Sequence, residues 1–163
     1  MAEIRVAVLT VSDAGSRGER EDRSGPAVAA WAEGHGWQVT ERAMVPDEAA
    51  EISRILEAWA DAGGADLIVT TGGTGLTRRD VTPEATRAVL EREAPGIPEA
   101  MRAAVLREFP RAALSRGVAG TRARTLIINL PGSPGGVRDG LAVLDGIVEH
   151  AVELLRGDHT EHG

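Results

Sequence analysis

Cysteine and lysine are both absent from this chain of 163 residues, and each absence removes a class of chemistry. Without cysteine the protein has no disulfide, no thiolate metal ligand and no thiol nucleophile. Without lysine it has no P-loop lysine, no Schiff base and no lysine acid or base, because all 18 basic residues are arginine. Any neutralisation of bound phosphate must therefore come from arginine, backbone N–H groups or a metal ion.

Long hydrophobic runs are also missing, and so is an excess of positive charge. The apolar stretches at 4–11, 66–71 and 125–130 are too short to span a bilayer. No signal-like segment opens the chain, so we expect a cytoplasmic protein with no membrane partner. The net charge of −7 argues against broad binding to nucleic acid, although one local basic pocket could still hold a small anion.

The order of the apolar segments predicts an α/β fold, a three-layer αβα sandwich around a mostly parallel sheet. The strands are hydrophobic along their whole length, which is typical of a sheet buried on both faces. The expected strands are 4–11, 37–45, 66–71 and 125–130. Three helices are expected to begin near residue 24, at Asp47 and at Thr82, with Asp47 and Thr82 as their N-caps. Two more helices are expected over 97–108 and 136–156. Residues 111–124 are expected to be irregular.

A chain of this length with 42% hydrophobic residues can bury the core of one ordinary domain. We expect that single domain to span residues 1–156. The remaining residues, 157–163, are expected to form a flexible C-terminal tail.

Candidate binding residues follow the carboxyl ends of the predicted strands, where ligands bind in open parallel sheets. Four segments distant in the sequence would therefore converge on one rim of the sheet. They are Ser12 and Asp13 after the first strand, Asp47 after the second, Thr71, Gly72, Gly73, Thr74, Gly75 and Asp80 after the third, and Asn129, Pro131, Gly132 and Ser133 at the fourth.

The stretch TTGGTGLTRRDVTPE, at 70–84, carries the strongest chemical signal. Its glycines let the backbone approach an anion and turn N–H groups toward it. Asp80 supplies a hard oxygen ligand suited to magnesium, and Arg78 and Arg79 supply forked donors suited to phosphate. The plainer interpretations are a tight turn, a solvated pair of arginines and, for Asp47, only a helix cap.

Four motifs together resemble the MoaB/Mog family of molybdenum-cofactor biosynthesis. They are TTGGTG (70–75), RDVTPEAT (79–86), LSR (114–116) and LIINLPGSP (126–134). The resemblance implies a molybdopterin adenylyltransferase, in which the terminal phosphate of molybdopterin attacks the α-phosphate of ATP with magnesium and releases pyrophosphate. It also implies a homo-oligomer, a trimer in preference to a hexamer, and allows the molybdenum-insertion enzyme as a partner.

Residue roles follow from the same resemblance. Asp47 and Asp80 match the two aspartates tied to catalysis, and we assign them to magnesium binding or substrate orientation in place of a cap role for Asp47. The turn at 72–75 would cradle phosphate. Ser115, Arg116 and the segment 129–133 would line the pocket for pterin and nucleotide.

Two other functions are compatible with the sequence. One is a non-catalytic module of the MoaB type that binds molybdopterin or assists assembly. The other is a nucleotide-processing enzyme of the related damage-inducible family, which normally carries an additional amidase domain for which these 163 residues leave no room. Nucleotide binding separates the first alternative from the enzyme.

Overall fold

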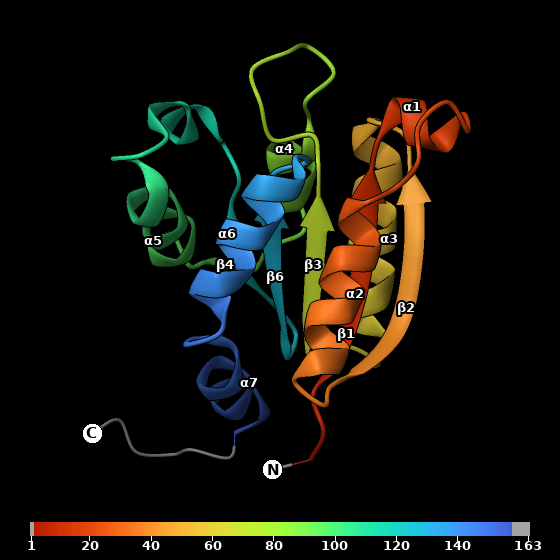
Figure 1. The fold of residues 1–163 in the computed structure, drawn as a ribbon. Coiled ribbons are helices and arrows are strands. Elements are labelled where there is room, and N and C mark those ends of the chain that lie inside the picture. Colours follow the sequence, from red (N-terminus) through yellow and green to blue (C-terminus); the bar gives the residue numbers. More distant parts are fainter. Residues whose placement is uncertain (1, 158–163) are drawn as a thin grey trace.

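The computed structural model describes residues 2–157, and its strands form a six-stranded sheet in the order β2-β1-β3-β6-β5-β4 (Figure 1). The strands are β1 (Arg5–Val11), β2 (Gln38–Val45), β3 (Leu67–Thr71), β4 (Arg92–Glu93), β5 (Ala119–Arg122) and β6 (Thr125–Leu130). Neighbours among β2, β1, β3 and β6 are parallel, whereas β5 and β4 pair antiparallel at the other edge. The mostly parallel sheet is thereby confirmed.

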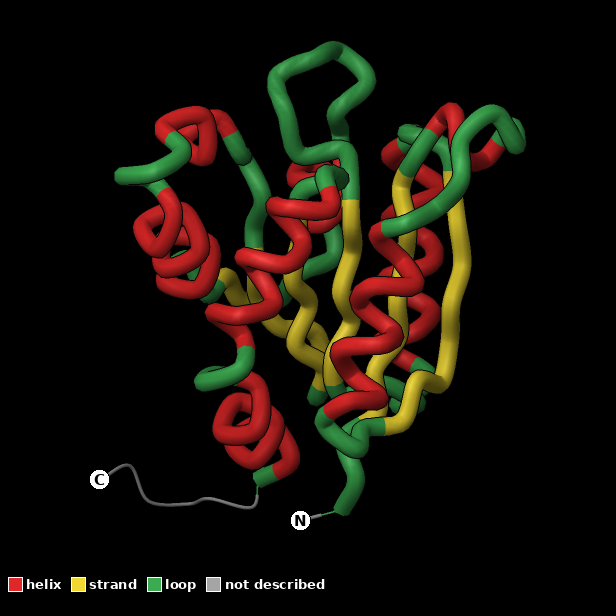
Figure 2. Tube along the Cα trace, in the orientation of Figure 1, coloured by secondary structure: helices red, strands yellow, loops and turns green. Residues whose placement is uncertain are grey.

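Helices cover both faces of the sheet, as the uninterrupted apolar strands require (Figures 1 and 2). The helical segments are α1 (Asp13–Ser16), α2 (Ser24–Gly34), α3 (Ala49–Asp61), α4 (Thr82–Arg87), α5 (Gly96–Val105), η1 (Pro110–Leu114), α6 (Pro134–Leu144) and α7 (Val148–Arg156). No helix in this described part of the chain is both long and apolar enough to cross a membrane.

Alternate residues of the central strands enter two separate hydrophobic cores. Val6 and Val8 pack with α2, α6 and α7 on one face, whereas Ala7 and Leu9 pack with α3 and α4 on the other. These strand residues are at most 1% exposed. The three-layer αβα sandwich is therefore confirmed, with a core on each side of the sheet.

Two helix N-caps differ from the prediction. The N-cap of α3 is Glu48 rather than Asp47, and the Glu48 side chain makes no capping bond. The Asp47 carboxylate accepts the Asp13 N–H instead of capping the helix. The N-cap of α4 is Val81, because Thr82 lies inside the helix and its hydroxyl donates to the carbonyl of Gly72. Both side chains have tertiary partners that the local sequence does not reveal.

The predicted long helix over 136–156 is wrong, because the structure breaks it into α6 and α7. A helix of that length would extend about 30 Å, whereas the six residues of β6 extend only about 20 Å. The chain turns near Gly146, so that Leu144 and Val148 both reach the same hydrophobic core.

The interpretation of 111–124 as irregular is also wrong in part, since this region contains all of η1 but its first residue, and all of β5. The hairpin from β5 to β6 turns at Ala123, a non-glycine residue with a φ of +52°. Neither the short AGTR strand nor this turn carries the usual sequence signature of a hairpin. The predicted tail falls almost entirely on residues 158–163, which lie outside the described residues.

Candidate active site

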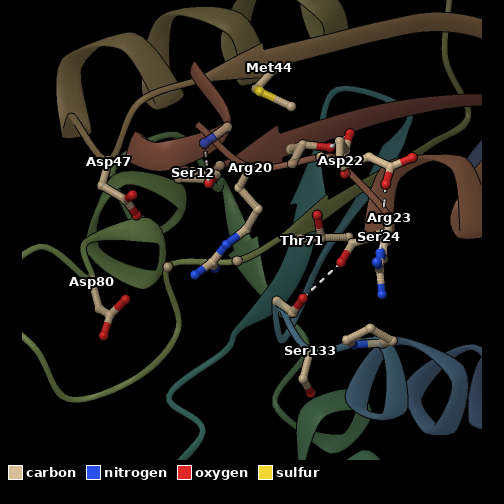
Figure 3. Close-up of a pocket in the computed structure, with 18 residues that line it drawn as sticks. Ser12, Arg20, Asp22, Arg23, Ser24, Met44, Asp47, Thr71, Asp80 and Ser133 are labelled. Carbon is tan, nitrogen blue, oxygen red and sulfur yellow. Dashed lines mark hydrogen bonds and ion pairs between the residues drawn. The ribbon is translucent and has the colours of Figure 1, made fainter. Parts of the chain in front are cut away.

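The carboxyl ends of the parallel strands open on one rim of the sheet, from which the loop after β3 projects (Figures 1 and 2). A cavity of about 690 Å³, here called the β1 pocket, lies on this rim. The predicted residues that line it are Ser12, Asp47, Thr71, Gly72, Gly73, Asp80, Gly132 and Ser133 (Figure 3). The predicted convergence of four strand ends is confirmed by this lining.

A second cavity of about 740 Å³, here called the α5 pocket, adjoins the first. Most of the remaining predicted residues line this second cavity, namely Thr74, Gly75, Ser115, Asn129 and Pro131. Its wall includes apolar side chains of α5, of η1 and of the segment between them, namely Pro98, Met101, Val105, Phe109 and Leu114. Gly73, Asp80, Gly132 and Ser133 line both cavities and so form the boundary between them.

The glycine turn after β3 has a backbone that only glycine adopts without strain. Gly72 and Gly73 have φ angles of +91° and +70°. A Cβ on Gly72 would collide with the carbonyl oxygen of Val11, and one on Gly73 would collide with the Thr82 hydroxyl and lie 3.0 Å from an Asp47 carboxylate oxygen. The glycines therefore allow the turn to pass close to Asp47.

Asp13 and Asp47 are joined by reciprocal hydrogen bonds across the ends of β1 and β2. Each carboxylate accepts the backbone N–H of the other residue, both at 2.9 Å. Burial raises the pKa of Asp47, and the negative charges of Asp13 and Asp80 add to this effect. Hydrogen bonds from Arg79 and then from the Asp47 N–H lower the pKa of Asp13 to about 2.

Arg79 closes the projecting loop onto the ends of β1 and β2. Its guanidinium donates to both carboxylate oxygens of Asp13, at 2.9 and 3.0 Å, and to Glu48 at 2.9 Å. Its fork is thus occupied by carboxylates rather than left open for phosphate. Arg78 is exposed and lines neither cavity.

Asp80 is held in place from within its own loop. One of its carboxylate oxygens accepts the Thr77 N–H at 3.0 Å and the Thr77 hydroxyl at 2.8 Å. Arg116 donates to the carbonyls of Gly75 and Asp80 and pairs with Glu84 at 2.7 Å. Arg116 therefore supports the loop that carries Asp80.

The Asn129 side chain is buried at 3% exposure in β6 and is fully engaged inside the protein. Its amide donates to the hydroxyls of Thr70 and Thr86, and its oxygen accepts the Val118 N–H. This network joins β3, β6 and α4 beneath the α5 pocket. Ser115, by contrast, is partly exposed and its carbonyl accepts a hydrogen bond from Arg102.

Sequence reasoning missed one wall of the β1 pocket, formed by residues 20–24 and Met44. Residues 20–24 lie too far along the chain from the end of β1 for the strand-end rule to select them, and Met44 lies inside β2, just before its last residue. The apolar wall of the α5 pocket was also missed. Helical periodicity shows that α5 has an apolar face, but not that this face lines a cavity.

Among residues 2–157, no group of three or more His, Cys, Asp or Glu side chains is arranged to hold a metal by protein ligands alone. Magnesium commonly binds through one or two carboxylates, with the remaining positions filled by water and substrate phosphates. Asp47 and Asp80 line the same cavity, and the pKa of Asp47 is raised first by burial and then by the negative charges of Asp13 and Asp80. These residues fit a cation of that kind.

The chain is similar over nearly its whole length to characterised proteins. Residues 7–150 match the family described as probable molybdopterin binding domain. A molybdopterin adenylyltransferase from Helicobacter pylori is 39% identical over 99% of this chain and 93% of its own, and one from Escherichia coli K12 is 40% identical over 99% and 90%. The crystal structure of the molybdopterin biosynthesis enzyme MoaB from Thermus thermophilus superimposes with a TM-score of 0.89 at 52% identity, covering 94% of this chain and 97% of its own.

Proposed function

Because the chain belongs to the family of probable molybdopterin binding domains, we propose that it is a molybdopterin adenylyltransferase of molybdenum cofactor biosynthesis. The observation that carries the proposal is the pair of adjoining cavities, which share a boundary at Gly73, Asp80, Gly132 and Ser133. Two substrates of moderate size that react through phosphate groups need such a double site. The transferring phosphate would lie at the shared boundary.

The reaction suits the side chains that the chain has. A phosphate monoester oxygen of molybdopterin attacks the α-phosphorus of ATP, and the bond from that phosphorus to the bridging oxygen of the β-phosphate breaks, so pyrophosphate leaves. The monoester is largely ionised near neutral pH, so no strong general base is required. The absence of cysteine and lysine is therefore no obstacle, and the protein's task is alignment and charge neutralisation.

Asp47 and Asp80 would hold magnesium, which when bound neutralises charge on the ATP phosphates. The chain's own residues fix where this happens. The reciprocal bonds with Asp13 orient the Asp47 carboxylate, and Thr77 orients that of Asp80. The glycine turn brings backbone close to both carboxylates, Gly73 to that of Asp47 and Gly75 to that of Asp80. A homotrimer and a cytoplasmic location stay predictions from the family resemblance.

Pyrophosphate release tests the proposal. Purified protein with ATP, magnesium and molybdopterin should release pyrophosphate only when all three are present. Asp80→Asn should lower this turnover by orders of magnitude while the fold persists, since asparagine can still accept from Thr77 but lacks the charge. Full activity in the variant would remove Asp80 from the mechanism. Tight binding of molybdopterin without binding of ATP would favour the non-catalytic module instead.

A further inference from the structure

Arg20 lines the β1 pocket, and its guanidinium N–H groups are not used in hydrogen bonds with other residues of the described chain. Its side chain extends into the cavity (Figure 3), and it makes no hydrogen bond or ion pair with the other described residues. Arg23, the other arginine of this wall, lies 3.9 Å from Glu21. Arg79, at the far side of the site, is occupied by Asp13 and Glu48. A free guanidinium fork in a cavity is suited to a phosphate oxyanion.

Two helices of eleven residues begin at the wall of the same cavity. Ser24 and Pro134, the first residues of α2 and α6, both line it. The two N-termini are tied together, because the Ser24 hydroxyl donates to the carbonyl of Gly132 at 2.8 Å (Figure 3). The α2 end already holds the Asp22 carboxylate through the Gly25 N–H, whereas the α6 end is capped only by the neutral Ser133 hydroxyl, so the dipole of α6 favours an anion at this wall.

Thr71 supplies an independent sign of a missing partner. It ends β3 at the wall of the cavity, is 1% exposed, and its hydroxyl has no hydrogen-bond partner among residues 2–157. Thr10, its neighbour in β1, donates instead to Asp22, and the other oxygen of that carboxylate accepts the Gly25 N–H. A buried hydroxyl without a partner is unfavourable, so its presence at a cavity wall points to a ligand oxygen.

We propose that Arg20 and Thr71 form an oxyanion subsite in the β1 pocket that binds a phosphate group of the substrates. The proposal rests on the proposed function and adds to it a binding residue, Arg20, from the loop between α1 and α2. The phosphate oxygens that would accept these hydrogen bonds are present both in the nucleotide and in the phosphate monoester of molybdopterin. In either case the guanidinium extends toward the side of the cavity that Asp47 and Asp80 line, so the anion would be held beside the carboxylates (Figure 3).

Calorimetric titration of the intact protein with ATP alone, and with molybdopterin alone, tests Arg20 without any turnover. Arg20→Gln should weaken binding of one of them by about 10- to 100-fold, the range for hydrogen bonds to charged groups. Arg20→Lys should restore part of the loss, because it keeps the charge but not the fork. Arg17→Gln is the matched control, because Arg17 lies in the same segment but pairs with Glu19 outside the cavity.

The affected ligand identifies the source of the phosphate. Loss with ATP assigns the subsite to the nucleotide, and loss with molybdopterin assigns it to the pterin. Unchanged affinity for both in Arg20→Gln overturns the proposal, as does an equal loss in Arg17→Gln. If the wild type forms no adenylylated product while Arg20→Gln still loses affinity, the proposed reaction fails and the subsite stands.

Thr71→Val tests the second donor of the subsite. Measuring both ligand affinity and the midpoint of urea unfolding separates a role in binding from a role in the fold. Removing an unpartnered hydroxyl should leave the midpoint of urea unfolding unchanged while it weakens binding of the same ligand by about 2- to 10-fold. A lower midpoint with unchanged affinity would mean that the hydroxyl serves the fold, and would remove Thr71 from the subsite.

Discussion

Asp13 and Asp47 exchange backbone hydrogen bonds, yet their carboxyl groups are shifted in opposite directions. Arg79 forks onto Asp13 and lowers its pKa to about 2. Asp47 accepts no hydrogen bond from an arginine of residues 2–157, and burial raises its pKa. Arg79 therefore holds one charge in a fixed pair, whereas the charge on Asp47 remains available to a cation. This division of roles between neighbouring carboxylates is the main residue-level feature of the site.

Asp47→Asn should abolish most activity without lowering stability. Because folding raises the pKa of Asp47, the ionised carboxylate opposes folding, and this penalty grows as pH rises from the ordinary aspartate value through the raised one. Asparagine removes the penalty and can still accept the Asp13 N–H. Urea unfolding at neutral pH should therefore give an equal or higher midpoint, with turnover reduced by orders of magnitude. A clear loss of stability would mean that the Asp47 charge supports the fold.

The pH profile of the wild type gives a second view of the same residue. If ionised Asp47 is required, kcat/KM should fall in acid with an apparent pKa above about 4, the ordinary aspartate value. A steady-state profile from pH 4 to 8 would measure it. A midpoint at or below about pH 4 would show that the pKa of Asp47 is not raised, and a rate that stays constant down to pH 4 would show that ionised Asp47 is not needed, because even an ordinary aspartate is about half protonated there.

At the scale of elements, the turn between β3 and α4 determines where the carboxylates of Asp47 and Asp80, the proposed magnesium ligands, lie relative to the backbone. The Thr82 N–H and hydroxyl bond to the carbonyls of Gly73 and Gly72, and Arg116 bonds to those of Gly75 and Asp80. The loop is thus fixed at both ends by side chains from α4 and from the segment before β5. The result is a rigid support for the boundary between the two cavities.

Gly73→Ala should destabilise the protein by about 1–3 kcal/mol and impair binding, because its φ of +70° is unfavourable for alanine and the added Cβ would collide with Thr82. Gly64→Ala is the matched control, since that glycine has no positive φ and nothing within 4 Å of the added Cβ. Denaturant unfolding of the two variants measures the difference. Equal stability of both would contradict the strained geometry of the turn.

Most elements of the parallel sheet could be predicted from the sequence, because β1, β3 and β6 are short apolar runs that no helix pattern fits. The strand-end rule likewise selected most residues that line the two cavities, and their roles in binding and catalysis stay predictions. The caps could not be predicted, because Asp47 and Thr82 bind partners from other elements. Likewise β5 has no hydrophobic run, and Arg20 enters the cavity only through the path of its loop.

At the scale of the whole molecule, a buried ionic cluster closes the end of the sheet opposite the site. Asp66 precedes β3, has a side chain only 3% exposed, and pairs with Arg5 at 3.1 Å and with Arg156 of α7 at 2.7 Å. Arg156 also donates to the carbonyls of Ala2 and Glu3. One carboxylate thus joins the N-terminal segment, the central sheet and the last helix.

Asp66→Asn should destabilise the protein, because it leaves two arginines without their anion. The loss should lie toward the lower end of about 3–5 kcal/mol, because the Arg5 side chain is 39% exposed and can be solvated by water. Burial alone would raise the pKa of Asp66, but hydrogen bonds from Arg156 and Arg5 outweigh it and hold the pKa at about 2. The wild type's advantage over the variant should therefore be complete above about pH 4 and fall as pH drops toward 2. Urea unfolding at several pH values measures both effects, and a difference independent of pH would contradict them.

Transfer of label from ATP to molybdopterin tests the central claim most directly. Wild-type protein incubated with magnesium, molybdopterin and ATP labelled at the α-phosphorus should yield labelled adenylyl-molybdopterin and unlabelled pyrophosphate in equal amounts. Asp66→Asn, assayed where it is folded, should give the same product, and Asp80→Asn should give almost none. Label that stays in ATP, with wild-type protein that is folded and binds both substrates, would contradict the account.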